Sequence, residues 1–304
     1  MVSIAMAVYN GSMYLKEQLD SIERQTIKPD EIVIVDDSSS DPSDDIIASF
    51  IEHSNIAVKY IKHEINKGYG MTFFDAIMMT SGDVIFLSDQ DDIWAENKIE
   101  RTLDFIKTNK NIKCISSRNI YINSAGEVIG REKRKYNLLY NVPIDSLLTQ
   151  TELRPGMSLA FTRDVLLKLQ KINLSMFNQH DRLIELIACD NNGFFIAEEY
   201  LTKYRLHGKN TSGLNRGIRA RIGLNDRAKK SLNEMAYLEN ILKLQIINSS
   251  NEDEVKSQIE FYRNRAKLLS NRSFIHYVFG MLPYYKRANG IRMIIGDINA
   301  ILKG

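Results

Sequence analysis

The sequence predicts an α/β fold: a mostly parallel sheet with helices on both faces, followed by a helical extension. Short apolar stretches alternate along the first part of the chain with segments whose apolar residues recur at helical spacing. Strands that are apolar throughout are typical of parallel sheets covered on both faces. Beyond about residue 213 the chain becomes helical and basic. We therefore expect an α/β domain over residues 1–213 and a basic helical extension over residues 214–304.

The predicted elements follow from these patterns in chain order. Four apolar segments predict the first strands: 2–8, 31–35, 58–63 and 83–88. Amphipathic segments between and after them predict helices: 14–22, 43–51, 68–79 and 96–107. The later part mixes strand segments with helices: strand 113–117, hairpin 119–129, core segment 156–161, helices 163–169 and 180–188, and short strands 194–196 and 203–207.

The composition excludes several classes of protein. With 304 residues, 44% apolar and 26% charged, the chain can bury a sizeable core. Cys114 and Cys189 lie far apart without a CxxC pattern, so neither a disulfide framework nor a zinc site is predicted, and a reducing cytoplasm fits best. The first residues lack the basic segment of a signal peptide, and no apolar run approaches the about 20 residues of a membrane span. We expect a cytoplasmic protein, either free or peripheral on the inner face of the plasma membrane.

Charge is distributed unevenly along the chain. Residues 215–304 contain 16 Lys and Arg against 8 Asp and Glu, a net +8, which leaves 24 against 30, a net −6, for residues 1–214. The basic segments alternate with aromatic residues, a pattern that fits either an anionic membrane surface or a packed helical extension with a solvated charged face. Nucleic-acid binding is not predicted, because no recognition module accompanies the charge. The sequence does not indicate an oligomeric state.

Polar residues follow three of the predicted strands at the point where each strand ends. They are Tyr9-Asn10, Asp36-Asp37 and Asp89-Gln90-Asp91-Asp92. Ligands of open α/β sheets collect at the carboxyl ends of the strands, so these side chains are expected at one site. A cluster of Asp is costly to hold together unless a divalent cation neutralises it, which predicts a metal site. The alternative is an acidic turn that caps the following helix.

The ordered set of motifs resembles the family 2 glycosyltransferases, which have the Rossmann-like GT-A fold, from Val2 to about Ser212. The motifs that carry the resemblance are Tyr9-Asn10-Gly11, Val35-Asp36-Asp37-Ser38-Ser39, Asn66-Lys67-Gly68, Ser81-Gly82-Asp83, Asp89-Gln90-Asp91-Asp92-Ile93-Trp94, His180-Asp181 and Tyr204-Arg205-Leu206-His207-Gly208-Lys209-Asn210. Each motif is weak alone, whereas their order and spacing are specific. Within the family the pattern is most similar to bacterial rhamnosyltransferase-like enzymes of cell-surface polysaccharide synthesis. The resemblance implies an inverting, metal-dependent glycosyltransferase that moves a sugar from a UDP- or dTDP-sugar to a hydroxyl of a saccharide or lipid-linked acceptor.

The resemblance also implies a bound Mn²⁺ or Mg²⁺, which neutralises the departing diphosphate as a Lewis acid. Asp89 and Asp91 occupy the family's DxD positions, with Asp91 at the metal and Asp89 at the ribose and the metal. His207 is the candidate third metal ligand. Asp92 is either a further carboxylate of this site or the cap of a helix that carries Trp94.

The implied donor-binding residues come from all of the strand ends. Carboxylates at the end of the second strand accept hydrogen bonds from the base and ribose, although residues there equally suit a helix cap. Lys67, in the loop after the third strand, either reaches the diphosphate or base or is a solvated loop residue. The full predicted donor set is Tyr9, Asn10, Asp36, Asp37, Lys67, Asp89, Arg205 and Lys209.

Asp181 matches the family's catalytic base, which takes the proton of the acceptor hydroxyl. The alternative is an Asp in the first turn of a helix, stabilised by the helix dipole. Residues 154–158 keep the texture of an acceptor loop, but Arg182 and Leu183 stand where related enzymes carry aromatic residues, so acceptor stacking is not expected there.

Other functions fit less well. A nucleotide-sugar-binding subunit of a polysaccharide assembly complex, without transfer activity, is the main alternative. A sugar-nucleotide pyrophosphorylase would carry a Gly-rich basic loop after the first strand, and a dinucleotide oxidoreductase would carry GxGxxG. Neither motif is present.

Overall fold

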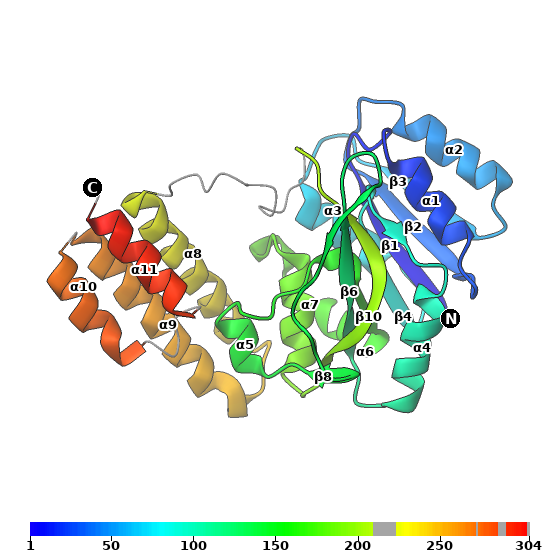
Figure 1. Ribbon diagram of the computed structural model, residues 1–304. Coiled ribbons are helices and arrows are strands. Elements are labelled where there is room, and N and C mark those ends of the chain that lie inside the picture. The colour runs from blue at the N-terminus through cyan, green and yellow to red at the C-terminus, as the bar shows by residue number, and fades with distance from the viewer. Residues whose placement is uncertain (209–222, 272, 285–289, 303–304) are drawn as a thin grey trace. The chain divides into compact units, whose positions relative to one another are not determined.

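The computed structural model describes residues 1–208, 223–271, 273–284 and 290–302 (Figure 1). The chain divides into two compact units: Met1–Val142 with Arg154–Thr211, and Pro143–Leu153 with Ser212–Gly304. The short segment Pro143–Leu153 therefore groups with the C-terminal residues. That residues 1–213 carry the function and residues 214–304 form an extension stays a prediction.

The first unit is built on a ten-stranded sheet. Its first half is parallel, in the order β3-β2-β1-β4. These strands are β1 (Val2–Val8), β2 (Glu31–Asp36), β3 (Ala57–Lys62) and β4 (Val84–Ser88). Every residue of β2 and β4 is buried, which explains why their sequences are apolar without alternation. Their carboxyl ends lie at one edge of the sheet, as predicted.

The second half of the sheet mixes directions. β9 (Leu159–Thr162) pairs antiparallel with both β4 and β6 (Cys114–Ile122), and β6 runs parallel to β10 (Phe194–Arg205). The remaining strands pair antiparallel at the margins: β5 (Ile93–Trp94) and β8 (Leu139–Asn141) on β10, and β7 (Val128–Arg131) on β6. The antiparallel β9 joins the two parallel blocks into one sheet.

Helices cover both faces of this sheet (Figure 1). One layer shares a single apolar core with β1 and β2: α1 (Leu15–Glu23), α2 (Ser43–His53) and α4 (Lys98–Thr108). The other layer holds α3 (Tyr69–Met78), which contacts α7 (His180–Cys189), and α6 (Arg163–Leu169), which contacts α7 as well. Short 3-10 turns are η1 (Gly156–Ser158) and η2 (Leu174–Met176). The predicted α/β fold with helices on both faces is confirmed.

Two local predictions were wrong. Trp94 is in β5, paired with Thr202 of β10, and α4 begins only at Lys98, so Asp92 does not cap a helix that carries Trp94. The strands predicted at 194–196 and 203–207 are one strand, β10, with register shifts between Ile196 and Thr202. Consecutive glutamates inside β10 interrupt its apolar pattern, and the sequence therefore suggested a break that long-range pairing bridges.

The second unit is helical. Its elements are α5 (Ile144–Leu148), α8 (Leu224–Lys243), α9 (Ser249–Ser270), α10 (Phe274–Met281), η4 (Leu282–Tyr284) and α11 (Gly290–Ile301). A fully buried carboxylate, Asp297 of α11, accepts hydrogen bonds from Arg265 of α9, Arg227 of α8 and Tyr277 of α10. This one side chain therefore joins four helices. Within the described residues, no helix combines the length and the apolar character needed to cross a membrane.

Candidate active site

Three carboxylates converge directly after β4. Asp89, Asp91 and Asp92 each offer one oxygen, and these oxygens all lie within 4.8 Å of one another. The chain turns sharply here, because β4 ends at Ser88 and β5 leaves at Ile93 in a different part of the sheet. The turn therefore places like charges together that an extended strand would keep apart.

Electrostatics show how strained this arrangement is. Burial, followed by repulsion from Asp91 and Asp181, raises the pKa of Asp89 to about 8. Burial, followed by repulsion from Asp91 and Asp89, raises the pKa of Asp92 well above its usual value. Lys98 lies near both carboxylates and lowers their pKa values, while burial lowers its own pKa to about 7.

Lys98 is a residue of the site that sequence reasoning missed. It is the first residue of α4 and only 1% exposed. Its Nζ donates to the carbonyl of Met157 (2.7 Å) and to the hydroxyl of Thr202 (2.9 Å), and it lies 4.1 Å from the ring centroid of Trp94. A buried Lys beside acidic residues is costly unless it is paired. Its sequence neighbourhood, a polar helix start, gives no signal of this contact.

Arg205 and His207 bring the end of β10 to the acidic turn. The backbone N–H of Arg205 donates to Oδ1 of Asp92 (2.9 Å), and its Nε donates to the carbonyl of Asp91 (2.8 Å). The guanidinium also reaches the turn at Ser124 and the carboxylate of Glu17. It thus fixes the acidic turn, and its predicted contact with the donor stays a prediction.

His207 lies against the predicted metal ligand Asp91. Its Nε2 is 2.7 Å from Oδ2 of Asp91, and both side chains are 13% exposed. The ring also lies 5.1 Å, between centroids, from that of Tyr14, the residue before α1. The structure therefore brings together Asp89, Asp91 and His207, which the sequence predicted as one ligand set, although they are far apart in the chain.

The ends of β1 and β4 are clamped to each other by Gln90. Its Oε1 accepts from the backbone N–H of Tyr9 (2.7 Å), and its Nε2 donates to the Tyr9 carbonyl (3.0 Å). A Cβ on Gly11 would stand 2.4 Å from the same Oε1, so any other residue at this position would displace the Gln90 side chain. The side chain of Tyr9 stays 50% exposed beside this clamp. Asn10, at a left-handed φ of 48°, accepts from Ser40 through its side-chain oxygen and so ties the β1 end to the β2 end.

The two carboxylates that follow β2 differ in what they bind. Asp37 accepts from the backbone N–H groups of Lys67 (2.7 Å) and Gly68 (2.8 Å) and contacts His63 (2.9 Å), so both of its oxygens hold the loop before α3. Asp36 accepts from Ser39 through Oδ1 (2.6 Å), while its buried Oδ2 has no hydrogen-bond partner among the described residues. The donor-binding role predicted for Asp36 stays a prediction.

Lys67 leaves this loop towards α3. Its Nζ contacts Asp75 at 2.8 Å, and the side chain is 44% exposed. Lys209, predicted beside it in the donor set, lies outside the described residues. The donor roles of both stay predictions.

Asp181 lies in the first turn of α7, near enough to the acidic turn for its charge to act on Asp89. Burial and repulsion from Asp91 are the larger causes of the raised pKa of Asp89, and the charge of Asp181 raises it further. Burial is likewise the larger cause of the raised pKa of Tyr69, and the charge of Asp181 adds to it. The preceding His180 is buried and stacks on Phe73, with ring centroids 4.0 Å apart. A Cβ on Gly156 would lie 3.1 Å from Nε2 of His180 and 3.6 Å from Cβ of Asp181, so η1 approaches this turn closely.

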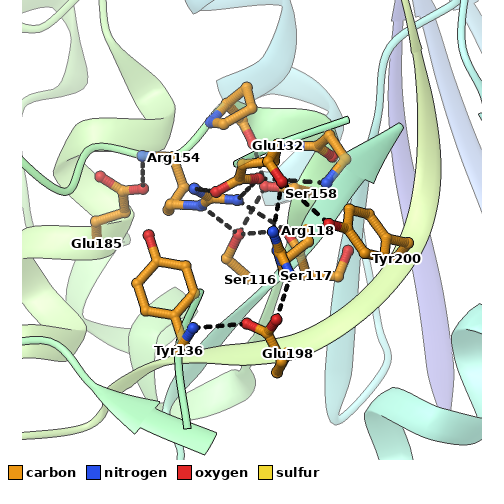
Figure 2. A network of polar contacts seen from close by, with 12 residues as sticks. Ser116, Ser117, Arg118, Glu132, Tyr136, Arg154, Ser158, Glu185, Glu198 and Tyr200 are labelled. Atoms are coloured by element: carbon orange, nitrogen blue, oxygen red, sulfur yellow. Dashed lines mark hydrogen bonds and ion pairs between the residues drawn. The ribbon is translucent and has the colours of Figure 1, made fainter. Parts of the chain in front are cut away.

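A buried network holds η1 in that position (Figure 2). Arg154 donates through Nη2 to Glu132 (2.7 Å) and to the Ser117 carbonyl (3.0 Å), and through Nε to Ser116 (3.0 Å). Its backbone N–H donates to Glu185 of α7 (2.8 Å). The network therefore links β6, the segment after β7, and α7 just before η1.

Figure 2 also shows the second arginine of this network, Arg118. It pairs with Glu198 of β10, donates to the carbonyl of Glu132, and lies 4.3 Å from the ring centroid of Tyr200. Glu198 in turn accepts from the backbone N–H of Tyr136 (2.7 Å). Glu199, the other glutamate that interrupts the apolar pattern of β10, pairs with Arg101 of α4, so both glutamates are paired inside the unit.

The acidic turn has the features of a site for a hard divalent cation. Oδ2 of Asp92 is buried and has no hydrogen-bond partner among the described residues. Close carboxylates with raised pKa values are what a bound cation neutralises, and carboxylate oxygens are the ligands that Mg²⁺ prefers. The donor set of Asp89, Asp91 and His207 therefore fits the metal that was predicted.

The sequence profile of Glycosyl transferase family 2 matches residues 3–170, which is more than half of the chain. The chain belongs to glycosyltransferase family 2. This confirms the resemblance predicted from the motifs, and it makes the protein a glycosyltransferase that uses a nucleotide-sugar donor.

Named relatives agree with this assignment. The dTDP-rhamnosyl transferase RfbG of Shigella flexneri is 30% identical over 241 residues, covering 72% of this chain and 78% of the relative. An uncharacterised glycosyltransferase of Methanocaldococcus jannaschii is 29% identical over 212 residues, covering 68% of this chain and 71% of the relative. The UDP-Glc:alpha-D-GlcNAc-diphosphoundecaprenol beta-1,3-glucosyltransferase WfgD of Escherichia coli is 32% identical over 162 residues, or 51% of this chain and 62% of that one.

Solved structures confirm the GT-A type of fold. S. aureus TarS in complex with UDP matches with a TM-score of 0.62 at 16% identity, covering 93% of this chain and 74% of that one. The mannosyltransferase PcManGT from Pyrobaculum calidifontis, in complex with GDP-Man and Mn²⁺, matches with a TM-score of 0.52 at 14% identity, covering 99% of this chain and 86% of that one.

Proposed function

We propose that this glycosyltransferase moves a sugar, with inversion, from a UDP- or dTDP-sugar to a hydroxyl of a saccharide or lipid-linked acceptor of cell-surface polysaccharide. The observation that carries the proposal is a further carboxylate, Asp181, which lies near enough to the acidic turn to raise the pKa of Asp89. A base close to a diphosphate site is what this reaction requires. The names of RfbG and WfgD support the donor classes and the lipid-linked acceptor.

In this mechanism the chain's own residues position the donor and move one proton. Asp36 accepts a hydrogen bond from the base through its free Oδ2, and the exposed ring of Tyr9 flanks that base. Asp181 accepts the proton of the acceptor hydroxyl while the oxygen of that hydroxyl forms a bond to the anomeric carbon. The bond from that carbon to the diphosphate breaks, and the nucleoside diphosphate leaves with the electron pair.

Asp91, Asp89 and His207 would hold Mn²⁺ or Mg²⁺, and Asp92 lies in the same cluster of carboxylates. When bound, the cation supplies Lewis-acid stabilisation of the departing diphosphate. We further propose that residues 1–213 carry the transferase and that the enzyme works in the cytoplasm. Free, buried thiols at Cys114 and Cys189 support that compartment, and immunoblots of fractionated cells test it.

A thermal-shift screen tests the donor and the metal together. UDP-, dTDP- and GDP-sugars are each added with and without Mn²⁺, and a donor at 100 times its Kd stabilises the fold by about 2.7 kcal/mol. We expect a Mn²⁺-dependent shift with a UDP- or dTDP-sugar, and its loss in Asp91→Asn. Metal-independent shifts would contradict the metal site. Donor binding without turnover on any extracted lipid acceptor would instead support a binding subunit.

A further inference from the structure

The second unit exposes an apolar stripe that runs from α10 into η4. Ile275, Phe279 and Leu282 recur at i, i+4 and i+7, and they are 65%, 72% and 64% exposed. Another side of α10 is anchored, since Tyr277 is fully buried and donates to Asp297. Within the part of the chain that the structure describes, the stripe is therefore the exposed face of a helix that Tyr277 anchors on another side.

The stripe lies in a stretch of sequence that carries only positive charge. Residues 261–296, between Glu260 and Asp297, contain seven Lys or Arg and no Asp or Glu. These basic residues are Arg263, Arg265, Lys267, Arg272, Lys286, Arg287 and Arg292. Arg265 is buried and bound to Asp297, so it adds no charge to the surface. Three of the basic residues flank α10 and η4 directly in sequence, at 272, 286 and 287. Exposed apolar side chains with basic neighbours are the pattern of an interfacial helix.

Two partners suit such a stripe, a second copy of the chain and an anionic lipid leaflet, and charge distinguishes them. A two-fold contact between copies would set the same positive stretch against itself. An anionic leaflet attracts it instead, at about fivefold in partition for each basic residue near the surface. We propose that α10 and η4 form a docking surface for an anionic lipid bilayer. The stripe enters among the headgroups, and the positive charge of this stretch of sequence attracts the anionic leaflet.

This surface gives the second unit a task separate from transfer. An enzyme held on a leaflet meets a lipid-linked acceptor by diffusion in two dimensions. That link to the acceptor rests on the function proposed above, whereas binding to the bilayer does not depend on it.

Co-sedimentation with vesicles tests the surface on the full chain. Wild-type protein is mixed with phosphatidylcholine vesicles, or with vesicles in which phosphatidylglycerol replaces part of that lipid. The variant Ile275→Ser/Phe279→Ser/Leu282→Ser removes the stripe. Leu232→Ser/Leu302→Ser is the matched control, because both residues are exposed apolar side chains of the same unit.

We expect the wild type and the control to bind only the anionic vesicles, and to bind less at 1 M salt, where the Debye length falls to about 3 Å. Each apolar side chain that leaves water contributes about tenfold, so the triple variant should bind at least about 100-fold more weakly. Equal binding by the triple variant would overturn the proposal. So would a wild-type dimer that the triple substitution converts to a monomer, with no vesicle binding by either protein, because the stripe would then bind a second copy.

Fluorescence gives a readout that needs no loss of function. The sequence has a single Trp, Trp94, which is 2% exposed, so Phe279→Trp adds a second and exposed reporter. We expect a blue shift and protection from acrylamide with anionic vesicles. An unchanged spectrum would place the stripe outside the bilayer. Donor is absent from both assays, and transfer to a soluble acceptor is measured separately, so failure of either proposal is recognised on its own.

Discussion

Each unit of the molecule holds a fully buried aspartate, and the two are satisfied very differently. Asp297 of the helical unit accepts from Nε (2.7 Å) and Nη2 (2.9 Å) of Arg265, from Arg227 (2.9 Å) and from Tyr277. Asp92 of the catalytic unit accepts one backbone N–H, from Arg205, and its Oδ2 has no partner among the described residues. The first carboxylate is saturated and the second is not.

The difference separates two uses of buried charge. A saturated carboxylate fixes the helices around it, and removing it strands its cations. An unsaturated one beside other carboxylates destabilises the free protein, and such strain is kept where a ligand relieves it. The number of donors around a buried Asp therefore distinguishes a structural role from a binding role more clearly than burial does.

The largest expected effect comes from the unsaturated site. Asp181→Asn removes the proposed base, and we expect kcat to fall by about 10²- to 10⁴-fold while the donor-induced thermal shift persists. The exposed α4 carboxylate in Asp104→Asn serves as the control. Initial rates with a saturating donor measure the effect. If kcat of Asp181→Asn stayed within about twofold of wild type, Asp181 would not be the base.

The saturated carboxylate should control stability instead. Asp297→Ala strands Arg265 in the helical bundle, and we expect a loss of about 3–5 kcal/mol in the free energy of unfolding of this unit. Urea titrations followed by far-UV circular dichroism measure it, with the 99% exposed Asp253→Ala as the control. Equal losses of unfolding free energy in Asp297→Ala and Asp253→Ala would show that the hydrogen bonds to Asp297 do not stabilise this unit.

Glu31 separates saturation from location, because it is a saturated carboxylate inside the catalytic unit. Burial by itself would raise its pKa, but hydrogen bonds from Ser3, Ser81 and Lys59 outweigh burial and lower the pKa from 4.5 to about 2. Because the pKa of Glu31 is lower in the folded than in the unfolded protein, its carboxylate stabilises the fold. This stabilisation is complete above pH 4.5 and is lost as the pH falls through about 2. It amounts to about 3 kcal/mol.

Unfolding of Glu31→Gln and wild type at two pH values tests this. The gap in unfolding free energy should be widest at pH 7 and should narrow at about pH 3. A gap that stays constant with pH would mean that the carboxylate charge contributes nothing.

The smallest effect has the opposite sign. Asp92→Asn keeps an acceptor for Arg205 and replaces a carboxyl whose charged form is disfavoured by burial and by Asp91 and Asp89, so the divalent-free protein should gain about 1 kcal/mol. Thermal melts in chelator measure the gain, and the same melts with Mn²⁺ should show a smaller metal-induced shift than wild type. A destabilised variant in chelator would show that the turn is not repulsive.

The sequence predicted those parts of the site that depend on local pattern. Asp36, Asp89 and Asp91 end apolar strands, and parallel strands bring such ends to one edge. Lys98 and the position of Trp94 could not be predicted, because both depend on pairing with β10, whose glutamates bind arginines from β6 and α4. Likewise, only the folded chain shows that Asp37 holds the loop of Lys67 while Asp36 keeps a free oxygen.

The contact between Arg205 and Asp92 spans 113 residues of chain. β10 is the last strand of its unit, so a growing chain has completed β1 to β4 well before anything can fix the acidic turn. Contacts between distant segments form late, after the entropy of closing long loops is overcome. During synthesis, affinity for metal and nucleotide sugar should therefore appear only once β10 has left the ribosome, and stalled chains of increasing length would show it as an abrupt gain.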